Sequence, residues 1–414
     1  MKILITTDAY GVMVNGVAIS VKNLSSALQE AGHDVRILTL SQTHHSYQDG
    51  NVYYIGSVAL KIYPDVRATL SFHNSLLKDI LEWKPDIIHS QSEFFTFIFA
   101  RRLSHLLQAP IVHTYHTLYE YYTHYFCPSK TLGHRIVLIG SRMVCNRADA
   151  VIAPTLKTAK ILEGYGVDSE IRVVPTGLDL GRFKESENTA SDWKKSTDPE
   201  ALKARLNIPK NAPVIVTLGR LAREKNVDFL IQQMSHPSLR KMGLHLVVVG
   251  DGPDRTRLER IVQQLKLHDV VHFTGMVAPE NVAHYYHIGD VFVSASSSET
   301  QGLTYIEAMA CGLPLLCRKD TCLESVLIPG YNGFFFEDTD EFVQYCCKLF
   351  EAKIALKKMG QNALSSAFHF SKETFAAHAA QLYMEVILNS EKEIEKCTRF
   401  ACIPKQIWHK VTGY

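Results

Sequence analysis

Two glutamates, Glu299 and Glu307, frame the segment whose residue types suggest the most specific chemistry in this chain. Gly302 lies between them, an apolar helical pattern begins just after it, and residues 290–296 upstream are typical of a buried strand. A helix N-terminus offers free N–H groups and a partial positive charge to phosphate oxygens, and carboxylates accept hydrogen bonds from sugar hydroxyls. The segment therefore suits a sugar attached to a diphosphate. The alternative is an ordinary strand–turn–helix with two surface acids.

A cationic loop, G-R-L-A-R-E-K-N at residues 219–226, follows another strand and leads into a helix. Arg220 and Lys225 can neutralise a diphosphate leaving group, and the arginine can do so through two parallel hydrogen bonds. Taken alone, this segment is equally well interpreted as a solvated basic loop.

Further candidates lie at the ends of other strands. V-V-V-G-D-G-P brings Gly250 to the end of a strand, and F-T-G-M-V, which ends at Val277, can offer backbone groups to a flat base. In V-N-G-V, ahead of a helix, Gly16 lets the backbone approach a phosphate closely. His116 ends the strand in T-Y-H-T, where a structural histidine is the alternative to a functional one.

Strand and helix patterns alternate through both halves of the chain, which is typical of doubly wound parallel sheets. In the first half we expect strands at 3–7, 35–40, 86–89, 111–115, 150–153 and 172–174, and helices at 19–31 and 76–82. In the second half we expect strands at 214–218, 245–249, 271–273, 290–294 and 314–317, with helices near 227–234 and 255–265 and at Glu307. The pattern predicts an α/β fold with two Rossmann-like domains facing a central cleft. Every candidate loop lies at the carboxyl end of a strand, where open α/β sheets bind ligands.

The domain boundaries follow from composition. Residues 179–212 are polar and charged and predict a connection with a short helix at 199–206. We therefore place one domain at 1–178, the other at 213–370, and a C-terminal helix with a basic amphiphilic tail at 371–414. The end of this tail, residues 392–414, suits either a helix that packs across both halves or a contact with a membrane surface.

The bulk composition excludes several classes of protein. The chain has 414 residues, with 46% hydrophobic and 21% charged residues and a net charge of +2, so no global field points to nucleic acid. Its nine cysteines are scattered without metal-ligand spacing, which favours reduced thiols. We find no signal peptide and no apolar run of about 20 residues, so we expect a cytoplasmic protein.

In combination and in this order, the motifs G-R-L-x-x-E-K, V-G-D-G-P, F-x-G and E-x7-E are highly specific. The chain resembles the retaining GT-B glycosyltransferases over roughly residues 1–390. Within that family, T-Y-H-T-L-Y-E-Y-Y-T-H-Y-F followed by P-S-K-T-L-G is most similar to the bacterial 1,2-diacylglycerol 3-glucosyltransferases. These enzymes make monoglucosyl-diacylglycerol for membranes and lipoteichoic acid anchors. The resemblance implies the same reaction here, with UDP-glucose as the donor and diacylglycerol as the acceptor.

The resemblance also implies a role for each matching residue. Arg220 and Lys225 should hold the donor diphosphate, Glu299 the sugar hydroxyls, and Glu307 the ribose. Backbone amides of Gly302, Leu303 and Thr304 should meet the sugar and phosphate, while Gly250 and Val277 should line the nucleotide site. Gly16 should lie beside the diphosphate, and His116 near the donor sugar and the acceptor.

The expected chemistry is front-face transfer, because no carboxylate nucleophile is evident. The departing diphosphate would itself deprotonate the incoming hydroxyl, while the protein positions the reactants and stabilises charge. We identify no Asp-x-Asp metal motif and expect neither a required metal nor another cofactor.

The acceptor lies in a bilayer, so the enzyme must reach a membrane surface. Residues 119–147 are rich in tyrosine and phenylalanine and carry four basic side chains that suit an anionic interface, namely Lys130, Arg135, Arg142 and Arg147. Lys61, Tyr63 and Arg67 are candidates for the same patch. We expect a peripheral protein on the inner face of the cell membrane. The alternative is an ordinary helix with a solvated basic face.

Other functions stay open from sequence. The enzyme could use UDP-galactose, or it could act on a glycosylated lipid or a soluble sugar. A protein of a different class, a catalytically silent GT-B protein that only binds membrane, is disfavoured by the intact set of Arg220, Lys225, Glu299 and Glu307.

Overall fold

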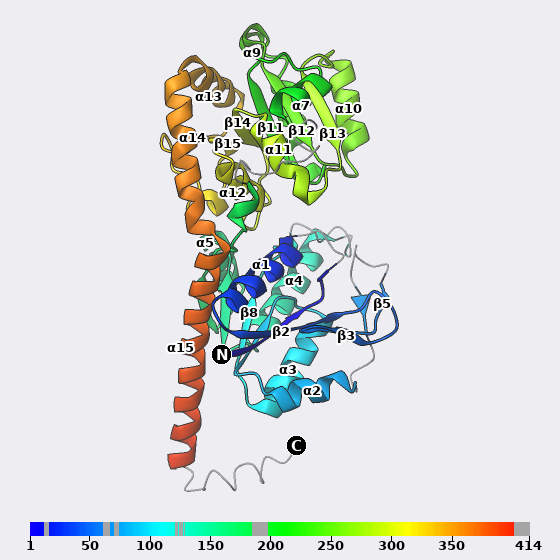
Figure 1. The fold of residues 1–414 in the computed structure, drawn as a ribbon, viewed down its shortest axis with the longest axis vertical. Helices are drawn as coiled ribbons and strands as arrows, with labels where there is room; N and C mark the ends of the chain where they lie inside the picture. The colour runs from blue at the N-terminus through cyan, green and yellow to red at the C-terminus, as the bar shows by residue number, and fades with distance from the viewer. Residues whose placement is uncertain are drawn as a thin grey trace. The chain divides into compact units, whose positions relative to one another are not determined.

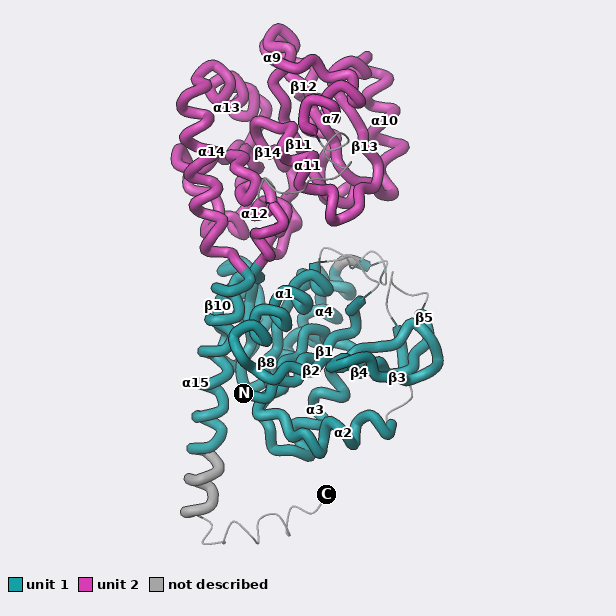
Figure 2. Tube along the Cα trace, viewed as in Figure 1, with its two compact units in different colours: residues 1–177, 372–414 teal, residues 178–371 magenta. Residues whose placement is uncertain are grey.

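The computed structural model describes most of the chain, namely residues 1–11, 16–60, 67–69, 74–120, 123, 127, 129–183 and 198–400, without the side chains of Lys130 and of 393–400. Val14 and Asn15 of the first loop, Lys61 and Tyr63 of the expected basic patch, and the tail beyond 400 lie outside these residues. The chain divides into two compact units (Figure 2). Unit 1 comprises Met1–Gly177 and Lys372–Tyr414, and unit 2 comprises Leu178–Ser371.

The described part of unit 1 contains an eight-stranded sheet of order β10-β9-β8-β7-β1-β2-β4-β3. All neighbours are parallel except the edge pair β3–β4. The strands are β1 (Lys2–Thr7), β2 (Asp34–Leu40), β3 (Tyr47–Asp49), β4 (Val52–Ile55), β7 (Ile87–Ser90), β8 (Ile111–Thr114), β9 (Ala150–Ala153) and β10 (Glu170–Val173). A separate short ribbon pairs β5 (Val58–Ala59) with β6 (Arg67–Ala68).

Helices cover both faces of this sheet, because its strands are apolar on both sides. One face packs on α2 (Leu76–Trp83), α3 (Phe95–Leu107) and α4 (Lys130–Cys145). The other packs on α1 (Gly16–Glu30) and α15 (Lys372–Phe400), which lie side by side (Figure 1). The helix α5 (Leu156–Gly164) lies between β9 and β10 in the chain. The C-terminal helix thus belongs to unit 1, although it follows unit 2 in sequence.

Unit 2 is built on a six-stranded parallel sheet of order β13-β12-β11-β14-β15-β16 within the described residues. The strands are β11 (Val214–Leu218), β12 (His245–Val249), β13 (Val271–Gly275), β14 (Val291–Ser294), β15 (Leu315–Arg318) and β16 (Gly333–Phe336). Its helices are α7 (Pro199–Arg205), α8 (Val227–Gln233), α9 (Pro237–Met242), α10 (Arg255–Gln264), α11 (Val282–His287), α12 (Leu303–Ala310), α13 (Thr339–Glu351) and α14 (Lys353–Ala367).

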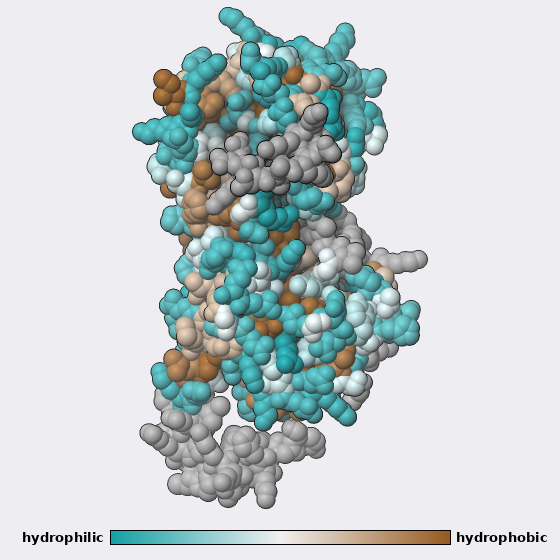
Figure 3. Space-filling view, in the orientation of Figure 1, coloured by the Kyte–Doolittle hydropathy of each residue, from teal (hydrophilic) through white to brown (hydrophobic). Residues whose placement is uncertain are grey.

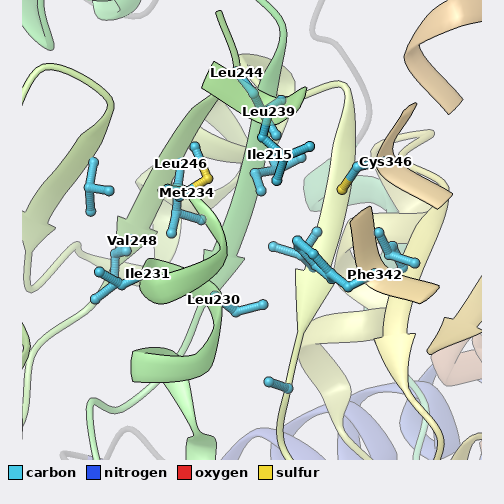
Figure 4. Packing of buried hydrophobic residues seen from close by; sticks show 14 of the residues in the cluster. Ile215, Leu230, Ile231, Met234, Leu239, Leu244, Leu246, Val248, Phe342 and Cys346 are labelled. Carbon is cyan, nitrogen blue, oxygen red and sulfur yellow. The ribbon is translucent and has the colours of Figure 1, made fainter. Parts of the chain in front are cut away.

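The core of unit 2 shows why β11 and β12 are nearly continuous apolar runs. Figure 4 shows Ile215, Leu246 and Val248 of these strands packed with Leu230 and Ile231 of α8. Strands that are covered on both faces have no solvent side on which polar residues could alternate. The two doubly wound sheets confirm the α/β class and the two Rossmann-like domains expected from sequence.

The packing of α15 on unit 1 can be tested by truncating a buried leucine on that helix. Leu382 is 2% exposed in the core beside α1. We expect Leu382→Ala to lower the free energy of unfolding of unit 1 by about 3 kcal/mol in urea denaturation, because it leaves a cavity. Leu388→Ala, at a position on the same helix that is 54% exposed, should change it by less than about 0.5 kcal/mol. Equal effects would contradict the assignment of α15 to this core.

Candidate active site

The candidate loops of unit 2 meet because their strands are neighbours. β11 lies between β12 and β14, so the loops after these three parallel strands emerge at the same edge of the sheet. Asn226 Nδ2 donates to the Ala295 carbonyl (3.2 Å), which ties the cationic loop after β11 to the end of β14.

An ion pair joins the two motifs that the sequence singled out. Lys225 Nζ donates to Glu299 Oε1, and these side chains are 26% and 16% exposed. Arg220 Nη2 donates to Glu224 Oε1 (2.8 Å), four residues along the same loop. The lysine and the glutamate are therefore held against each other in a partly dehydrated setting, where charges interact more strongly than in water.

A pocket surrounds this pair. It is lined by Thr217, Leu218, Gly219, Arg220, Leu221, Lys225, Val227, Val249, Ser294, Glu299 and Thr304. Four of the predicted site residues, Arg220, Lys225, Glu299 and Thr304, thus share one pocket. Val277 and Gly250 are outside its lining.

Gly250 has a packing role that explains its residue type. Its φ is +125°, and a Cβ there would lie 2.1 Å from the Gly219 carbonyl oxygen. A larger residue would push the end of β12 away from the loop after β11. The predicted nucleotide contact of Gly250 stays a prediction, as does that of Val277, which lies in the loop after β13.

The start of α12 is a glycine turn. Gly302, with φ +73° and ψ +72°, precedes Leu303 and has no side chain of its own to cap the helix. A Cβ on Gly302 would lie 2.2 Å from the buried Tyr305 ring, whose hydroxyl hydrogen-bonds Ser294 Oγ (2.9 Å). Thr304, in the first turn, lines the pocket, so the partial positive charge of this helix end lies beside Lys225 and Arg220.

Glu307 faces a tyrosine that the sequence reasoning missed. The Tyr286 hydroxyl donates to Glu307 Oε2 (2.9 Å) and lies 3.2 Å from the Thr304 carbonyl. Burial raises the pKa of Glu307, while the Tyr286 hydrogen bond and the Arg182 charge oppose that rise. Tyr286 lies on α11, just before β14, and the only sequence signal was its place ahead of the strand that leads to the acidic loop.

The remaining predicted residues, Gly16 and His116, belong to unit 1. Gly16 is the first residue of α1 and is exposed. His116 follows β8, and its Nε2 lies 2.6 Å from Gln91 Oε1. Burial lowers the pKa of His116 to about 4, so the imidazole is neutral at ordinary pH.

The basic residues expected at a membrane lie on and just after α4. Arg135, Arg142 and Arg147 are exposed, and Arg142 Nη2 lies 3.4 Å from Asp168 Oδ2. The side chain of Lys130 is outside the described residues. Exposed apolar side chains share the helix, namely Leu132 (54%), Ile136 (49%), Ile139 (64%) and Met143 (48%).

Both halves of the chain match family models. Residues 14–182 match Glycosyltransferase Family 4, and residues 198–366 match Glycosyl transferases group 1. An alpha-monoglucosyldiacylglycerol synthase of Streptococcus pneumoniae is 32% identical over 400 residues, which cover 96% of this chain and 89% of that protein. One from Acholeplasma laidlawii is 29% identical over 413 residues, covering 96% and 100%. The chain belongs to the GT-B glycosyltransferases.

Solved structures of other proteins have the same fold as this glycosyltransferase. The Anabaena protein HepE, in complex with UDP and glucose, has a TM-score of 0.70 at 18% identity and covers 93% of this chain and 100% of its own. Sucrose-phosphate synthase of Thermosynechococcus elongatus has a TM-score of 0.70 at 22% identity, covering 94% and 99%. The family models and the two relatives confirm the GT-B assignment made from the motif set.

The prediction that the chain has no Asp-x-Asp motif was wrong. Asp338 and Asp340 form this pattern, and Asp338 caps α13 by accepting from the Glu341 N–H (2.9 Å). Within the described ranges, no group of three or more His, Cys, Asp or Glu residues is arranged to hold a metal ion.

No helix in the described ranges is long and apolar enough to cross a bilayer. The face of the molecule shown in Figure 3 is mostly hydrophilic.

Substituting Gly302 tests directly whether the start of α12 belongs to the site of this glycosyltransferase. We expect Gly302→Ala to weaken UDP binding at least 10-fold by titration calorimetry, because its Cβ collides with the Tyr305 ring and shifts the start of α12. Gly330→Ala is the matched control, since Gly330 has φ +77° and open space around it. The Gly330→Ala variant should have a similar backbone strain, about 1–3 kcal/mol, and should bind UDP normally. Equal binding by the two variants would remove the α12 terminus from the site.

Proposed function

We propose that this chain is a retaining glucosyltransferase that moves glucose from UDP-glucose to the 3-hydroxyl of 1,2-diacylglycerol, giving α-monoglucosyl-diacylglycerol. The names of the two relatives that match nearly the whole chain support the glucosyl group, the diacylglycerol acceptor and the α linkage. They also disfavour the alternatives of a soluble acceptor or of a catalytically silent protein.

The observation that carries the proposal is the pocket that holds Lys225 against Glu299. In our proposal the donor diphosphate binds against Lys225, Arg220 and the start of α12, which are the positively charged groups of the pocket. Glu299 then contacts the hydroxyls of the sugar. Lys225 and Glu299 are paired with each other, so each restrains the other and both side chains lose little entropy on binding.

Glu307 is proposed to bind the ribose hydroxyls. Its Oε2 accepts from the Tyr286 hydroxyl, and this hydrogen bond restrains the carboxylate. Each carboxylate oxygen can accept two hydrogen bonds, so Oε1 can accept from both ribose hydroxyls.

The proposed reaction exchanges one bond at the anomeric carbon for another. The bond from C1 to the diphosphate oxygen breaks, the bond from C1 to the glycerol oxygen forms on the same face, and the glycerol proton passes to the departing phosphate. Negative charge grows on that phosphate in the transition state. Preorganised cations and helix amides stabilise it there without reorganisation.

A donor screen in mixed micelles tests the reaction. We expect UDP-glucose and diacylglycerol to give an α-linked product by NMR, and UDP-galactose to be the poorer donor. Glu299→Ala should lower kcat about 100-fold, the ~3 kcal/mol expected for losing one preorganised partner. Glu280→Ala, at an exposed acid in η4 (Pro279–Asn281), is the control and should retain activity.

The same assay tests the mechanism and the metal requirement. A β-linked product would exclude retention. We expect full activity in excess chelator, and a loss that only one divalent metal restores would overturn metal independence. Unchanged turnover in Glu299→Ala would return the protein to a purely binding role.

We further propose that α4 docks on an anionic membrane. Leu132, Ile136, Ile139 and Met143 recur at spacings of four, three and four residues, so they form one apolar stripe. Arg135 and Arg142 flank that stripe on one side. An apolar stripe bordered by arginines suits a helix that lies in the membrane interface, with its apolar side among the acyl chains and its charges at the headgroups.

Vesicle sedimentation separates the contribution of the arginine charges from that of the apolar stripe. Arg135→Gln with Arg142→Gln should weaken binding to anionic vesicles about 30-fold, at ~1 kcal/mol for each basic residue, with little effect on neutral ones. Ile139→Gln should weaken binding to both. Arg260→Gln, at an exposed residue of α10, is the control. Equal binding of all variants would rule out α4 as the docking helix.

A further inference from the structure

A buried polar group joins the ends of β7 and β8 to the C-terminal helix. His89 Nδ1 is hydrogen-bonded to the Tyr383 hydroxyl of α15, and His89 Nε2 to Thr114 Oγ1 (2.7 Å). Gln91, which is 1% exposed, lies between His89 and His116. The network is buried, so the orientation of each member is set by its partners.

The orientation of the Gln91 amide follows from its contact with His89. Its Nε2 lies 3.0 and 2.9 Å from the two ring nitrogens, and both of these already have hydroxyl partners. An atom at nearly equal distance from both nitrogens lies over the face of the imidazole. An N–H group is attracted to the π face of an aromatic ring, whereas a carbonyl oxygen is repelled by it. The amide nitrogen therefore belongs above His89, and the amide oxygen faces His116.

This orientation determines the tautomer of His116. Gln91 Oε1 carries no proton, so the 2.6 Å contact requires a proton on His116 Nε2. Burial keeps this imidazole neutral, with a pKa of about 4. Nδ1 then carries a bare lone pair, and it has no hydrogen-bond partner in the part of the chain that the structure describes.

We propose that Gln91 is a positioning residue that holds His116 in the Nε2–H tautomer and so presents Nδ1 as an acceptor to a substrate hydroxyl. This inference rests on the proposed glucosyl transfer, because the hydroxyl that His116 accepts from belongs to a substrate of that reaction. A bare lone pair accepts from an O–H group and repels a phosphate oxygen. His116 therefore recognises a sugar or glycerol hydroxyl, not the diphosphate.

The surrounding charges are compatible with a neutral His116. Burial lowers the pKa of His113 to about 3 and places the pKa of His89 well below its usual value, so both neighbouring histidines are neutral. Glu93 is the nearby carboxyl. It faces His113 Nε2 at 3.8 Å and accepts from the Tyr119 hydroxyl (2.8 Å), and burial raises its pKa to about 7. Asp8 lies near Glu93 and has a pKa of about 6, also raised by burial.

A double-mutant cycle tests the role in turnover. We expect Gln91→Leu and His116→Ala each to lower kcat roughly 10- to 100-fold, the loss of about one hydrogen bond to the transition state. Because Gln91 acts through His116, the double variant should be no slower than His116→Ala alone. Gln233→Leu removes another buried glutamine amide, whose nitrogen donates to the Phe229 carbonyl in unit 2, and it should retain activity. Additive losses would overturn the proposal.

Nitrogen NMR of histidine-labelled full-length protein tests the tautomer without any assay. His116 signals are assigned by their loss in His116→Ala. We expect a proton on Nε2 and none on Nδ1 at pH 7, and a mixture of tautomers in Gln91→Leu. A proton on Nδ1 in the wild type would refute the proposal even if glucose transfer is confirmed. The expected tautomer in a protein that transfers no glucose would instead refute the proposed function.

Discussion

The contact between Lys225 and Glu299 is the interaction on which the site in unit 2 depends. Its partners are 74 residues apart in the chain, and they meet only because β11 and β14 are neighbours in the parallel sheet. Two opposite charges side by side in a partly buried setting restrain each other and keep their side chains extended into one pocket. A ligand that carries both hydroxyls and phosphates can then divide its contacts between them.

Two glycines make this arrangement sterically possible. Gly250 allows the end of β12 to touch the Gly219 backbone, and Gly302 allows the acidic loop to turn sharply into α12 over the Tyr305 ring. Both have φ values that L side chains rarely adopt. The pocket therefore depends as much on the absence of side chains at these turns as on the charges themselves.

Sequence predicted the parts of the molecule that have a periodic or local signature. The buried strands 214–218 and 245–249 coincide with β11 and β12, and the predicted helix at 199–206 coincides with α7 to within one residue. The pairing of Arg220, Lys225, Glu299 and Thr304 in one pocket followed from their places at strand ends. The helix expected from residue 371 corresponds to α15. Its apolar face packs beside α1 in unit 1, and no pattern in the sequence predicted that partner.

Side-chain contacts between distant segments could not be predicted in the same way. His89 and Tyr383 are 294 residues apart, and neither residue has a pattern that names its partner. Tyr286 and Gln91 were missed for the same reason, since a hydroxyl or an amide becomes informative only when its orientation is known. The apolar stripe of α4 was not predicted, because apolar residues at this spacing usually face the core of an α/β domain. Only the structure shows that Leu132, Ile136 and Ile139 are exposed.

The two units handle charge in different ways. Unit 2 places a lysine, an arginine and a helix start around its pocket, which is how a protein stabilises a strongly anionic group. Near β7 and β8, unit 1 instead holds the buried His89, His113 and Gln91 beside a half-buried His116. Desolvation keeps the three imidazoles uncharged. Neutral donors and acceptors discriminate by the direction of a hydrogen bond, whereas charges act over longer distances with less dependence on angle. An uncharged hydroxyl is therefore better recognised by unit 1, and a diphosphate by unit 2, so the chemistry of each surface matches a different part of the proposed reaction.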